Sequence, residues 1–326
     1  MVLILNENDM RSAANLSEIM DAIEKSHILF RENQCYLPDR YSVNHNNKTM
    51  LYMPCYANGA IGTKMLAEFP DNPKKGLPYL SGLMILNNGE TGATEAVMNG
   101  EVLTALRTGA AGGVAMRHFA HEDSHSAGLV GCGVQGLHQL MYACEVRDIK
   151  SVYLFDAYVK NLQPFIEKLK IAILPKTVEI FVCEDTTELL KQSDIVITAT
   201  QARAPIFPDD AKLLEGKCFV AIGSWQPEMR EIPDAIWSVV DNVYTELPFA
   251  CEESGDLSQP IENGLLTADR VKFMGDYLKD KNKGITPKLG NTRFYKSVGM
   301  GIFDLMAAQV IFNNSKKKNI GKEIDW

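Results

Sequence analysis

The sequence predicts an α/β protein in which a doubly wound parallel sheet is joined to an N-terminal α+β domain. Three features lead to this prediction. Strand-like and helix-like stretches alternate from about residue 127 to residue 246, and the first of these strands runs into the glycine-rich turn Gly131–Gly136. The residues before this region are too numerous and too apolar to form a linker. Regular alternation is typical of a parallel sheet covered by helices.

The composition is that of a folded protein of one large or two ordinary domains, because 46% of the 326 residues are hydrophobic and 23% are charged. No apolar stretch approaches the roughly 18 residues of a membrane span, and the apolar start is too short for a secretory signal, so we expect a cytoplasmic protein. The net charge of −8 argues against nucleic acid as a partner. The seven cysteines contain no CxxC pair, which favours reduced thiols over disulfides or a zinc site.

The N-terminal block, residues 1–120, is predicted to be the substrate-binding domain. Residues 10–33 show the pattern of one amphipathic helix. Residues 41–70 and 79–100 contain strand-like stretches separated by Asn/Gly turns, and the latter part suggests a mixed sheet.

A strong helical pattern occupies residues 101–120. Thr104, Arg107, Thr108 and Ala111 fall three to four positions apart, so they share one face of this helix. The small residues from 109 to 113 allow another backbone or a ligand to come close.

The glycine-rich turn is a candidate dinucleotide site. A buried strand precedes it, its spacing matches G-x-G-x-x-G, and the residues after it have helical spacing. Such a turn presents backbone N–H groups and a helix N-terminus to a pyrophosphate. Glycine-rich turns also occur for packing reasons, so the motif alone leaves both interpretations open. The cofactor residues predicted here are Gly131, Gly133, Val134, Gln135 and Gly136.

Asp156 favours the dinucleotide interpretation. It ends the second strand-like stretch about twenty residues after Gly136, where a carboxylate can accept a hydrogen bond from a ribose 2′-OH. The alternative is an ordinary turn or cap aspartate. A carboxylate here would repel a 2′-phosphate, and the residues that follow offer Lys160 but no arginine to bind one. We therefore expect NAD(H) as the preferred cofactor and NADP(H) as the alternative.

Beyond Asp156 the alternation continues and gives six strand candidates up to about Glu246, with a Rossmann domain at residues 121–299 and a C-terminal helix and tail at 300–326. The carboxyl ends of parallel strands face the ligand crevice, so the loops after the fourth and fifth strands are candidate cofactor contacts. Small residues there could instead only permit tight turns. From these loops we select Ala199, Thr200 and Ser224.

Five segments resemble the ornithine cyclodeaminase/mu-crystallin family in order and spacing. They are TKMLAEFP, LTALRTGAAGGVA, GLVGCGVQG, AIGSWQPEMREI and KSVGMGIFDLMAA. The resemblance spans nearly the whole chain. It implies NAD(P)-dependent chemistry at the C–N bond of α-amino or α-imino acids. It also implies a homodimer formed through the substrate-binding domain, and a C-terminal helix that returns to that domain.

The resemblance assigns Arg40, Lys64 and Arg107 to substrate binding, with the substrate carboxylate held by Arg40 and Arg107. Guanidinium groups bind carboxylates in a fixed bidentate geometry, which would orient the neighbouring C=N for hydride transfer. Lys64 is the catalytic candidate, because an ammonium group of tuned pKa can deliver a proton. Each cation could instead be a surface or salt-bridge residue. The resemblance further places Thr108 at the pyrophosphate and Val298 beside the nicotinamide.

One departure from the family pattern bears on the reaction. Cyclodeaminases of this family carry an aspartate where this sequence has Trp225, and tryptophan cannot exchange a proton. The sequence is therefore more similar to the imine-reducing branch, which contains ketimine and 1-pyrroline-2-carboxylate reductases. The leading hypothesis is reduction of a cyclic or linear α-imino acid to an L-amino acid. Ornithine cyclodeaminase, an alanine-type dehydrogenase and a non-catalytic cofactor-binding protein remain alternatives.

Other polar residues are given structural interpretations. His118, His121 and His125 have a spacing that resembles a metal site, but they lie where a helix hands over to a strand, so we expect no metal. The acidic stretch Cys251–Asp256 is interpreted as a helix cap or a solvent-facing segment. The Met-rich residues 296–306 are interpreted as core.

Overall fold

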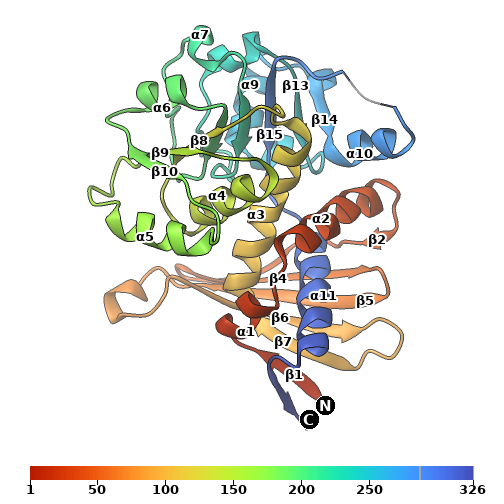
Figure 1. Cartoon of the computed structure of the whole chain (residues 1–326). Coiled ribbons are helices and arrows are strands. Elements are labelled where there is room, and N and C mark those ends of the chain that lie inside the picture. Colours follow the sequence, from red (N-terminus) through yellow and green to blue (C-terminus); the bar gives the residue numbers. More distant parts are fainter. Residues whose placement is uncertain (286–287, 326) are drawn as a thin grey trace. The chain divides into compact units, whose positions relative to one another are not determined.

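The computed structural model describes residues 1–285 and 288–325. The chain divides into two compact units, shown with their elements in Figure 1. Unit 1 comprises residues 1–107 and the segment from Met300 onward, and unit 2 comprises Thr108–Gly299. The division falls inside α3 (Gly100–Phe119), earlier than the boundary at residue 120 that the sequence predicted.

Unit 1 is built on a mixed eight-stranded sheet, which confirms the mixed sheet expected of the N-terminal block. The strand order is β16-β1-β7-β6-β5-β4-β2, with β3 paired to β4. Only the β1–β7 pair is parallel among the pairings of this sheet in the described residues. The strands are β1 (Val2–Leu5), β2 (Cys35–Tyr36), β3 (Tyr41–His45), β4 (Lys48–Ala57), β5 (Ala60–Glu68), β6 (Leu80–Asn88), β7 (Thr94–Asn99) and β16 (Lys322–Ile324).

The single helix predicted for residues 10–33 is wrong, because the segment forms α1 (Glu7–Ala13) and α2 (Leu16–Arg31). The break has a local cause. The side chain of Asn15 accepts a hydrogen bond from the backbone N–H of Glu18, which starts a new helix at this point.

The C-terminal helix α11 (Gly301–Lys318) packs against α2, β4 and β5 within unit 1, as Figure 1 shows for α2. The side chains of Ile302, Phe303 and Leu305 in its first turns are fully buried, so the core interpretation holds for them. Asp304 lies among them and is buried as well. An apolar helix thus carries one carboxylate into the interior of unit 1.

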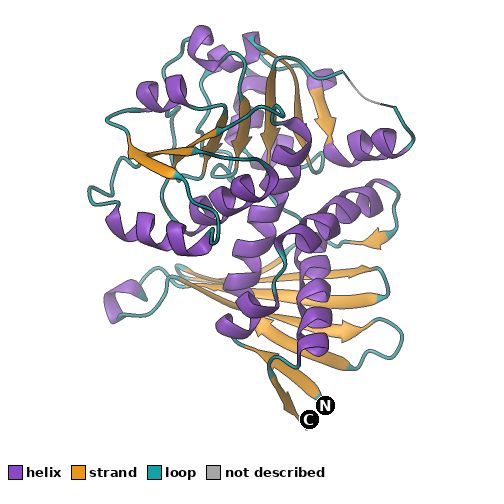
Figure 2. Cartoon of the chain, in the orientation of Figure 1, coloured by secondary structure: helices purple, strands orange, loops and turns teal. Residues whose placement is uncertain are grey.

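Unit 2 contains a fully parallel eight-stranded sheet in the order β10-β9-β8-β11-β12-β15-β13-β14, seen as arrows in Figure 2. All six predicted strands are present. They are β8 (Ser126–Val130), β9 (Ser151–Phe155), β10 (Glu179–Val182), β11 (Ile195–Thr198), β12 (Cys218–Ala221) and β13 (Val240–Thr245). The doubly wound α/β class is therefore confirmed.

Two strands were missed, namely β14 (Val271–Phe273) and β15 (Thr292–Lys296). The second lies between β12 and β13, so it is an inner strand. The apolar pattern did not predict β15 because this short strand contains two charged residues, Arg293 and Lys296. Contacts with distant residues satisfy these charges in the folded chain. Arg293 donates a hydrogen bond of 2.6 Å to the carbonyl of Phe119.

Helices accompany the strands of unit 2, as Figure 2 shows in purple. They are α4 (Val134–Val146), α5 (Gln163–Ala172), α6 (Thr186–Gln192), α7 (Ala211–Leu214), α8 (Ala250–Glu253), α9 (Gly255–Glu262) and α10 (Met274–Asn282). Because all strands are parallel, β8, β11, β12, β15 and β13 end at one edge of the sheet. In sheets of this class that edge binds the ligand.

The described residues contain no helix long and apolar enough to cross a membrane. The seven cysteines are all free. Within the same described part of the chain, no cluster of histidine, cysteine and carboxylate side chains is suited to hold a metal ion.

Candidate active site

The glycine-rich turn joins β8 to α4, and its three glycines serve different purposes. Gly131 has a φ of +97° and packs so tightly that an added Cβ would lie 2.6 Å from the carbonyl oxygen of Ala199. A Cβ at Gly136 would overlap the backbone of Gly131. At Gly133, the N-cap of α4, an added Cβ would meet nothing within 4 Å. The turn therefore leaves open space at the N-terminus of α4, as a pyrophosphate requires.

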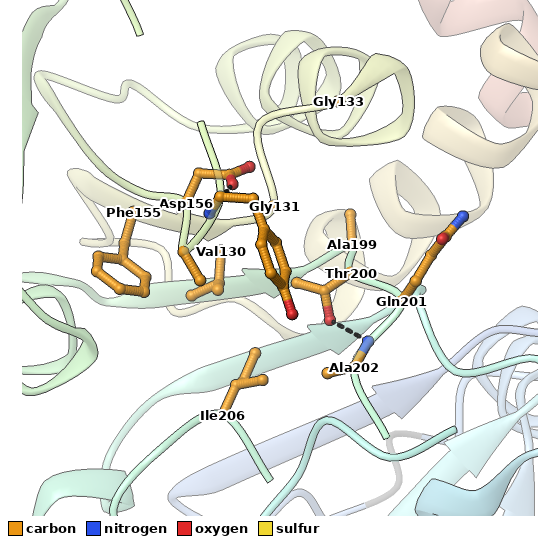
Figure 3. A pocket seen from close by; sticks show the side chains of 12 residues that line it. Val130, Gly131, Gly133, Phe155, Asp156, Ala199, Thr200, Gln201, Ala202 and Ile206 are labelled. Atoms are coloured by element: carbon orange, nitrogen blue, oxygen red, sulfur yellow. Dashed lines mark hydrogen bonds between the residues drawn. The ribbon is translucent and has the colours of Figure 1, made fainter. Parts of the chain in front are cut away.

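A cavity of about 560 Å³ adjoins this turn. Figure 3 shows Phe155 and Asp156 on one side and Thr200 and Ala202 on the other. The predicted cofactor residues that line it are Gly131, Gly133, Asp156, Ala199 and Thr200. Among the remaining lining residues are Val130, Phe155, Ala157, Ala202 and Ile206, all apolar. A largely apolar cavity with one carboxylate suits a flat base joined to a sugar.

Asp156 is engaged with the backbone around this cavity. Its Oδ2 accepts a hydrogen bond of 2.9 Å from the N–H of Cys132, and its Oδ1 accepts 3.0 Å bonds from Tyr158 and Val159. Partial burial raises the pKa of this carboxyl group, but the three donors outweigh it and leave the pKa below its usual value. The turn-aspartate interpretation thus describes part of its role. A carboxylate offers about four acceptor positions, so a ribose hydroxyl can still be accommodated.

The other predicted cofactor residues do not line this cavity. Val134 is 64% exposed in the first turn of α4, beside Gln135 and Gly136. The carbonyl of Thr108 accepts a 2.8 Å bond from Gln139.

Two further predicted residues lie at the ends of inner strands of unit 2. The buried hydroxyl of Ser224 donates to the carbonyl of Met229 at 2.6 Å. The N–H of Val298 donates to Glu246 at 3.3 Å. These contacts fix the backbone of both loops, and their role toward a cofactor stays a prediction.

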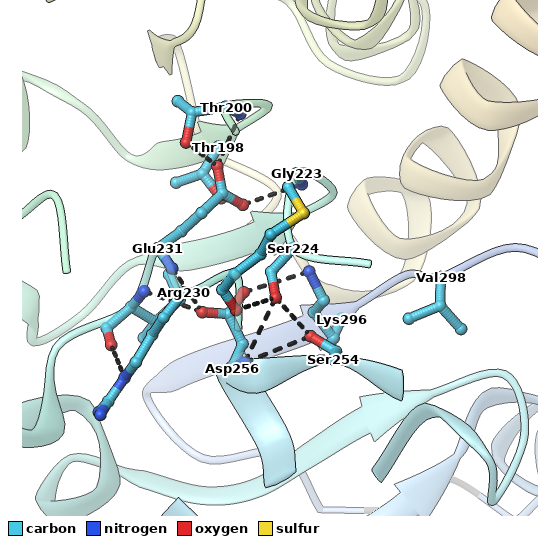
Figure 4. A network of polar contacts seen from close by, with 12 residues as sticks. Thr198, Thr200, Gly223, Ser224, Arg230, Glu231, Ser254, Asp256, Lys296 and Val298 are labelled. Atoms are coloured by element: carbon cyan, nitrogen blue, oxygen red, sulfur yellow. Dashed lines mark hydrogen bonds and ion pairs between the residues drawn. The ribbon is translucent and has the colours of Figure 1, made fainter. Parts of the chain in front are cut away.

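Unit 2 also holds a buried network of charges at this edge of the sheet, drawn in Figure 4. Glu231, Asp256 and Lys296 are all fully buried. Asp256 Oδ2 lies 3.1 Å from Lys296 Nζ, and Asp256 Oδ1 accepts bonds of 2.7 and 3.0 Å from the N–H groups of Glu231 and Ile232. Burial raises the pKa of Glu231; Lys296 opposes this shift and Asp256 adds to it.

The network was missed from the sequence. Of the two alternatives for residues 251–256, the helix cap is confirmed, because Ser254 caps α9 and Asp256 lies in its first turn; Asp256 does not face solvent, since it is fully buried. The sequence did contain a signal for this network: a charged residue such as Lys296 stands at the end of an apolar strand.

Unit 1 contains a second buried charge cluster, which includes two of the predicted substrate residues. Lys64, in β5, is fully buried, and its Nζ lies 2.8 Å from Asp304 Oδ1. Arg107 Nε lies 3.0 Å from the same oxygen. Asp304 was not predicted, although a single carboxylate within an apolar helical stretch was a visible signal.

The environment of Lys64 lowers its pKa to about 8. Burial is the main cause, and the positive charges of Arg107 and Arg40 act in the same direction, whereas Asp304 opposes them. Arg40 itself is exposed at the surface. Lys64 and Arg107 both meet the one carboxylate of Asp304, and Arg40 adds a third positive charge close enough to affect Lys64, so among these four groups positive charges outnumber negative ones. Such a cluster can attract an anion, and its ammonium group can exchange a proton near neutral pH.

The three histidines do not converge. His121 contacts the carbonyl of Asn291 at 3.1 Å, and His125 contacts that of Asp148 at 2.9 Å. His118 lies 2.8 Å from Lys281. Each ring thus has its own protein partner.

The parallel sheet, the glycine turn that opens α4 and the carboxylate after β9 define a doubly wound, Rossmann-type α/β protein. The chain belongs to the ornithine cyclodeaminase/mu-crystallin family, whose pattern matches residues 2–319.

Three relatives span essentially the whole chain. The Delta(1)-pyrroline-2-carboxylate reductase of Bacillus cereus is 28% identical over 333 residues, covering 100% of both chains. The alanine dehydrogenase of Archaeoglobus fulgidus is 29% identical over 325 residues, covering 99% of this chain and 98% of that one. The solved structure of Thermococcus litoralis Delta(1)-pyrroline-2-carboxylate reductase, in complex with NADH and L-proline, has a TM-score of 0.87 and 28% identity, covering 99% of this chain and 100% of that one.

Proposed function

We propose that the protein is an NAD(P)H-dependent reductase of cyclic or linear α-imino acids, which it converts to L-amino acids. The observation that carries the proposal is the cluster in unit 1, where Lys64 and Arg107 share the single carboxylate of Asp304. A pyrroline-2-carboxylate reductase as a whole-chain relative supports the same chemistry.

The cofactor assignment rests on the fit of unit 2 to a dinucleotide. The open space at Gly133 and the N-terminus of α4 suit the pyrophosphate, and the cavity beside Asp156 suits the adenosine. When bound, NADH would supply the hydride for the imine carbon. We propose NADH over NADPH because the carboxylate of Asp156, with its lowered pKa, is ionised at neutral pH and would repel a 2′-phosphate.

The chain's own residues would then carry out three tasks. Arg107 and Arg40 would hold the substrate carboxylate, which fixes the C=N bond beside it. Lys64 would hold a proton at Nζ and deliver it to the imine nitrogen, as the proton balance of the reduction requires. Asp304 would keep Lys64 charged until then, because it opposes the effect of burial on the pKa of Lys64.

Reduction of a preformed imine is preferred over cyclodeamination because of Trp225. Cyclodeamination needs proton transfer at several nitrogen atoms, whereas imine reduction needs one proton. The indole of Trp225, which is 40% exposed, cannot serve as a general acid or base.

We further propose a homodimer that forms through unit 1. Exposed apolar side chains gather on neighbouring strands β2 to β5; they are Tyr36, Tyr41, Val43, Tyr56 and Ile61. An archaeal alanine dehydrogenase that is 28% identical is described as a dimer with bound NAD. Sedimentation of wild type and Tyr41→Glu would test this: a dimer that the substitution dissociates supports it, and a wild-type monomer contradicts it.

The free thiols fit a reducing compartment such as the cytoplasm.

Parallel substrate assays test the proposed reaction. NADH oxidation with 1-pyrroline-2-carboxylate supports it. Reduction of NAD by L-alanine would favour the alanine-type dehydrogenase, which the Archaeoglobus relative makes the second candidate. Ammonia and proline formed from L-ornithine would favour the cyclodeaminase. Tight cofactor binding without turnover in any assay would favour a binding protein.

A further inference from the structure

The segment Arg230–Glu231 lies directly behind one wall of the cavity in unit 2. That wall consists of Ala199–Ala202 and Ile206. The N–H of Arg230 donates to the carbonyl of Ala202 at 2.9 Å, and the N–H of Ile206 donates to the carbonyl of Glu231 at 2.8 Å. The main chain of this segment therefore holds the wall at two points.

The side chain of Glu231 holds the same wall at further points, as Figure 4 shows. Its Oε1 accepts bonds of 2.7 Å from both the N–H and the hydroxyl of Thr200. Its Oε2 accepts the hydroxyl of Thr198 at 2.7 Å and the N–H of Gly223 at 2.8 Å. One fully buried carboxylate thus joins the loop after β11 to the turn after β12.

Close packing on both sides also restricts the movement of the wall formed by Ala199–Ala202. On one side, Gly131 of the glycine-rich turn lies against Ala199 without room for a Cβ. On the other side, a Cβ at Gly223 would overlap the backbone of Thr200. The segment around Thr200 therefore lies between the glycine-rich turn and Gly223, and the carboxylate of Glu231 sets its position.

The cavity matches the adenosine half of a dinucleotide. Its glycine end leads to the N-terminus of α4, where the pyrophosphate belongs, and Asp156 marks the position of the ribose. The apolar remainder, including Ala202 and Ile206, then faces the base.

We infer that Glu231 is a positioning residue for the adenosine half of the cofactor, acting through Thr200 and the wall that carries it. The inference rests on the cofactor of the proposed function. A carboxylate is required because all four groups that meet it are used as donors, and only an acceptor on both oxygens satisfies them. Asp256 fixes Glu231 in turn by accepting its N–H.

Binding of ADP-ribose, which contains the adenosine, the pyrophosphate and the second ribose but no nicotinamide, tests the inference by calorimetry. In Glu231→Gln one oxygen becomes an amide that cannot accept the N–H of Gly223 or Thr200, so Kd for ADP-ribose should rise about tenfold or more. The control is Glu262→Gln, the same replacement at an exposed position of unit 2, and it should bind like wild type. Unchanged binding by Glu231→Gln would overturn the inference, whereas a wild type that does not bind ADP-ribose would overturn the proposed cofactor itself.

Reduced nicotinamide mononucleotide separates positioning from general damage, because it lacks the adenosine half. The kcat/KM for this donor should stay within about twofold of wild type in Glu231→Gln, while the KM for NADH rises. Equal losses with both donors would indicate a merely structural role. If Glu231→Gln does not fold, Thr198→Val carries the test, since it removes one donor and leaves Glu231 in place. It should raise the Kd for ADP-ribose about threefold, and no rise would refute the inference.

Discussion

Each unit of the molecule contains a buried lysine–aspartate pair, and the two pairs differ in how their charges are satisfied. In unit 2, Lys296 and Asp256 lie 3.1 Å apart, and backbone N–H groups occupy the other carboxylate oxygen. In unit 1, Lys64 and Asp304 lie 2.8 Å apart, and the side chain of Arg107 is the other donor to Asp304 in the part of the chain that the structure describes.

The surroundings make the difference functional. With Glu231 included, the cluster of unit 2 has two carboxylates for one cation. Both oxygens of Glu231 and Oδ1 of Asp256 accept backbone N–H groups. The cluster of unit 1 has cations in excess, since Lys64 and Arg107 share one oxygen of Asp304. Asp304 Oδ2, like Asp256 Oδ2 in unit 2, has no hydrogen-bond partner within the described residues. Buried charges joined to backbone fix a scaffold, whereas an excess of cations can bind an anionic substrate.

Asp304→Asn should have the largest effect on stability. It leaves the ammonium of Lys64 buried without its counter-charge, which typically costs about 3–5 kcal/mol in the free energy of unfolding. Denaturant titration measures this loss. The double variant Lys64→Met/Asp304→Asn should recover most of it, because both charges are then gone. A double variant no more stable than the single one would contradict the view that the two charges balance each other.

Arg107→Leu tests whether the excess charge binds substrate. Its loss should cost about 2–5 kcal/mol in transition-state stabilisation, measured as kcat/KM for the imino acid, because the substrate carboxylate loses its partner. The Kd for NADH should barely change. A variant that loses NADH binding but keeps normal turnover at saturating NADH would refute this assignment.

The lowered pKa of Lys64 predicts opposite effects of pH on activity and on stability. Turnover should fall as pH rises through about 8, where Lys64 loses its proton. Between about 8 and the usual value of 10.5, the unfolded chain still binds that proton while the folded chain does not. The contribution of Lys64 to the free energy of unfolding should therefore rise by about 3 kcal/mol as the pH rises from about 8 to 10.5.

The check is a pH–rate profile, with denaturation of wild type and Lys64→Met on both sides of the window. A wild type whose stability relative to Lys64→Met does not increase with pH would show that burial does not control this group.

Cofactor preference should show the smallest effect. Wild type should favour NADH over NADPH by about tenfold in kcat/KM, or about 1.4 kcal/mol. Asp156→Ser should reduce this preference and also weaken both cofactors, because the N–H groups of Cys132, Tyr158 and Val159 lose their acceptor. The measurement is kcat/KM with NADH and with NADPH, for wild type and for Asp156→Ser. A wild-type preference for NADPH would be incompatible with this role of Asp156.

The fold was predictable where periodicity alone determines an element. The six strands from β8 to β13 and the glycine turn follow from local pattern. β15 was not predictable, because Arg293 and Lys296 join the sheet only once distant groups at Phe119 and Asp256 satisfy them. The cap residue Asn15 marks the break between α1 and α2 in the sequence. The amphipathic spacing continues across this break, so the spacing alone predicted one helix.

The site was predictable only in part for the same reason. Motifs indicated Lys64 and Arg107, yet Asp304, which joins them, lies 240 and 197 residues further along the chain. Glu231 likewise meets Thr198 and Thr200 only through the folded sheet. Contacts of this kind follow from three-dimensional packing, and no spacing in the sequence records them.

The most direct test of the central claim compares two matched double variants in imine reduction at saturating NADH. Lys64→Met/Asp304→Asn and Lys296→Met/Asp256→Asn each remove one buried ion pair, and the asparagine keeps an acceptor oxygen in both. The unit 1 variant should lose about 10²–10⁴-fold in kcat with 1-pyrroline-2-carboxylate, the usual contribution of a proton-transfer group. The unit 2 variant, per folded molecule, should stay within about tenfold of wild type. Equal losses in both, or normal turnover in the unit 1 variant, would contradict the claim that the charge cluster of unit 1 takes part in the reaction while the charge cluster of unit 2 supports the surrounding loops.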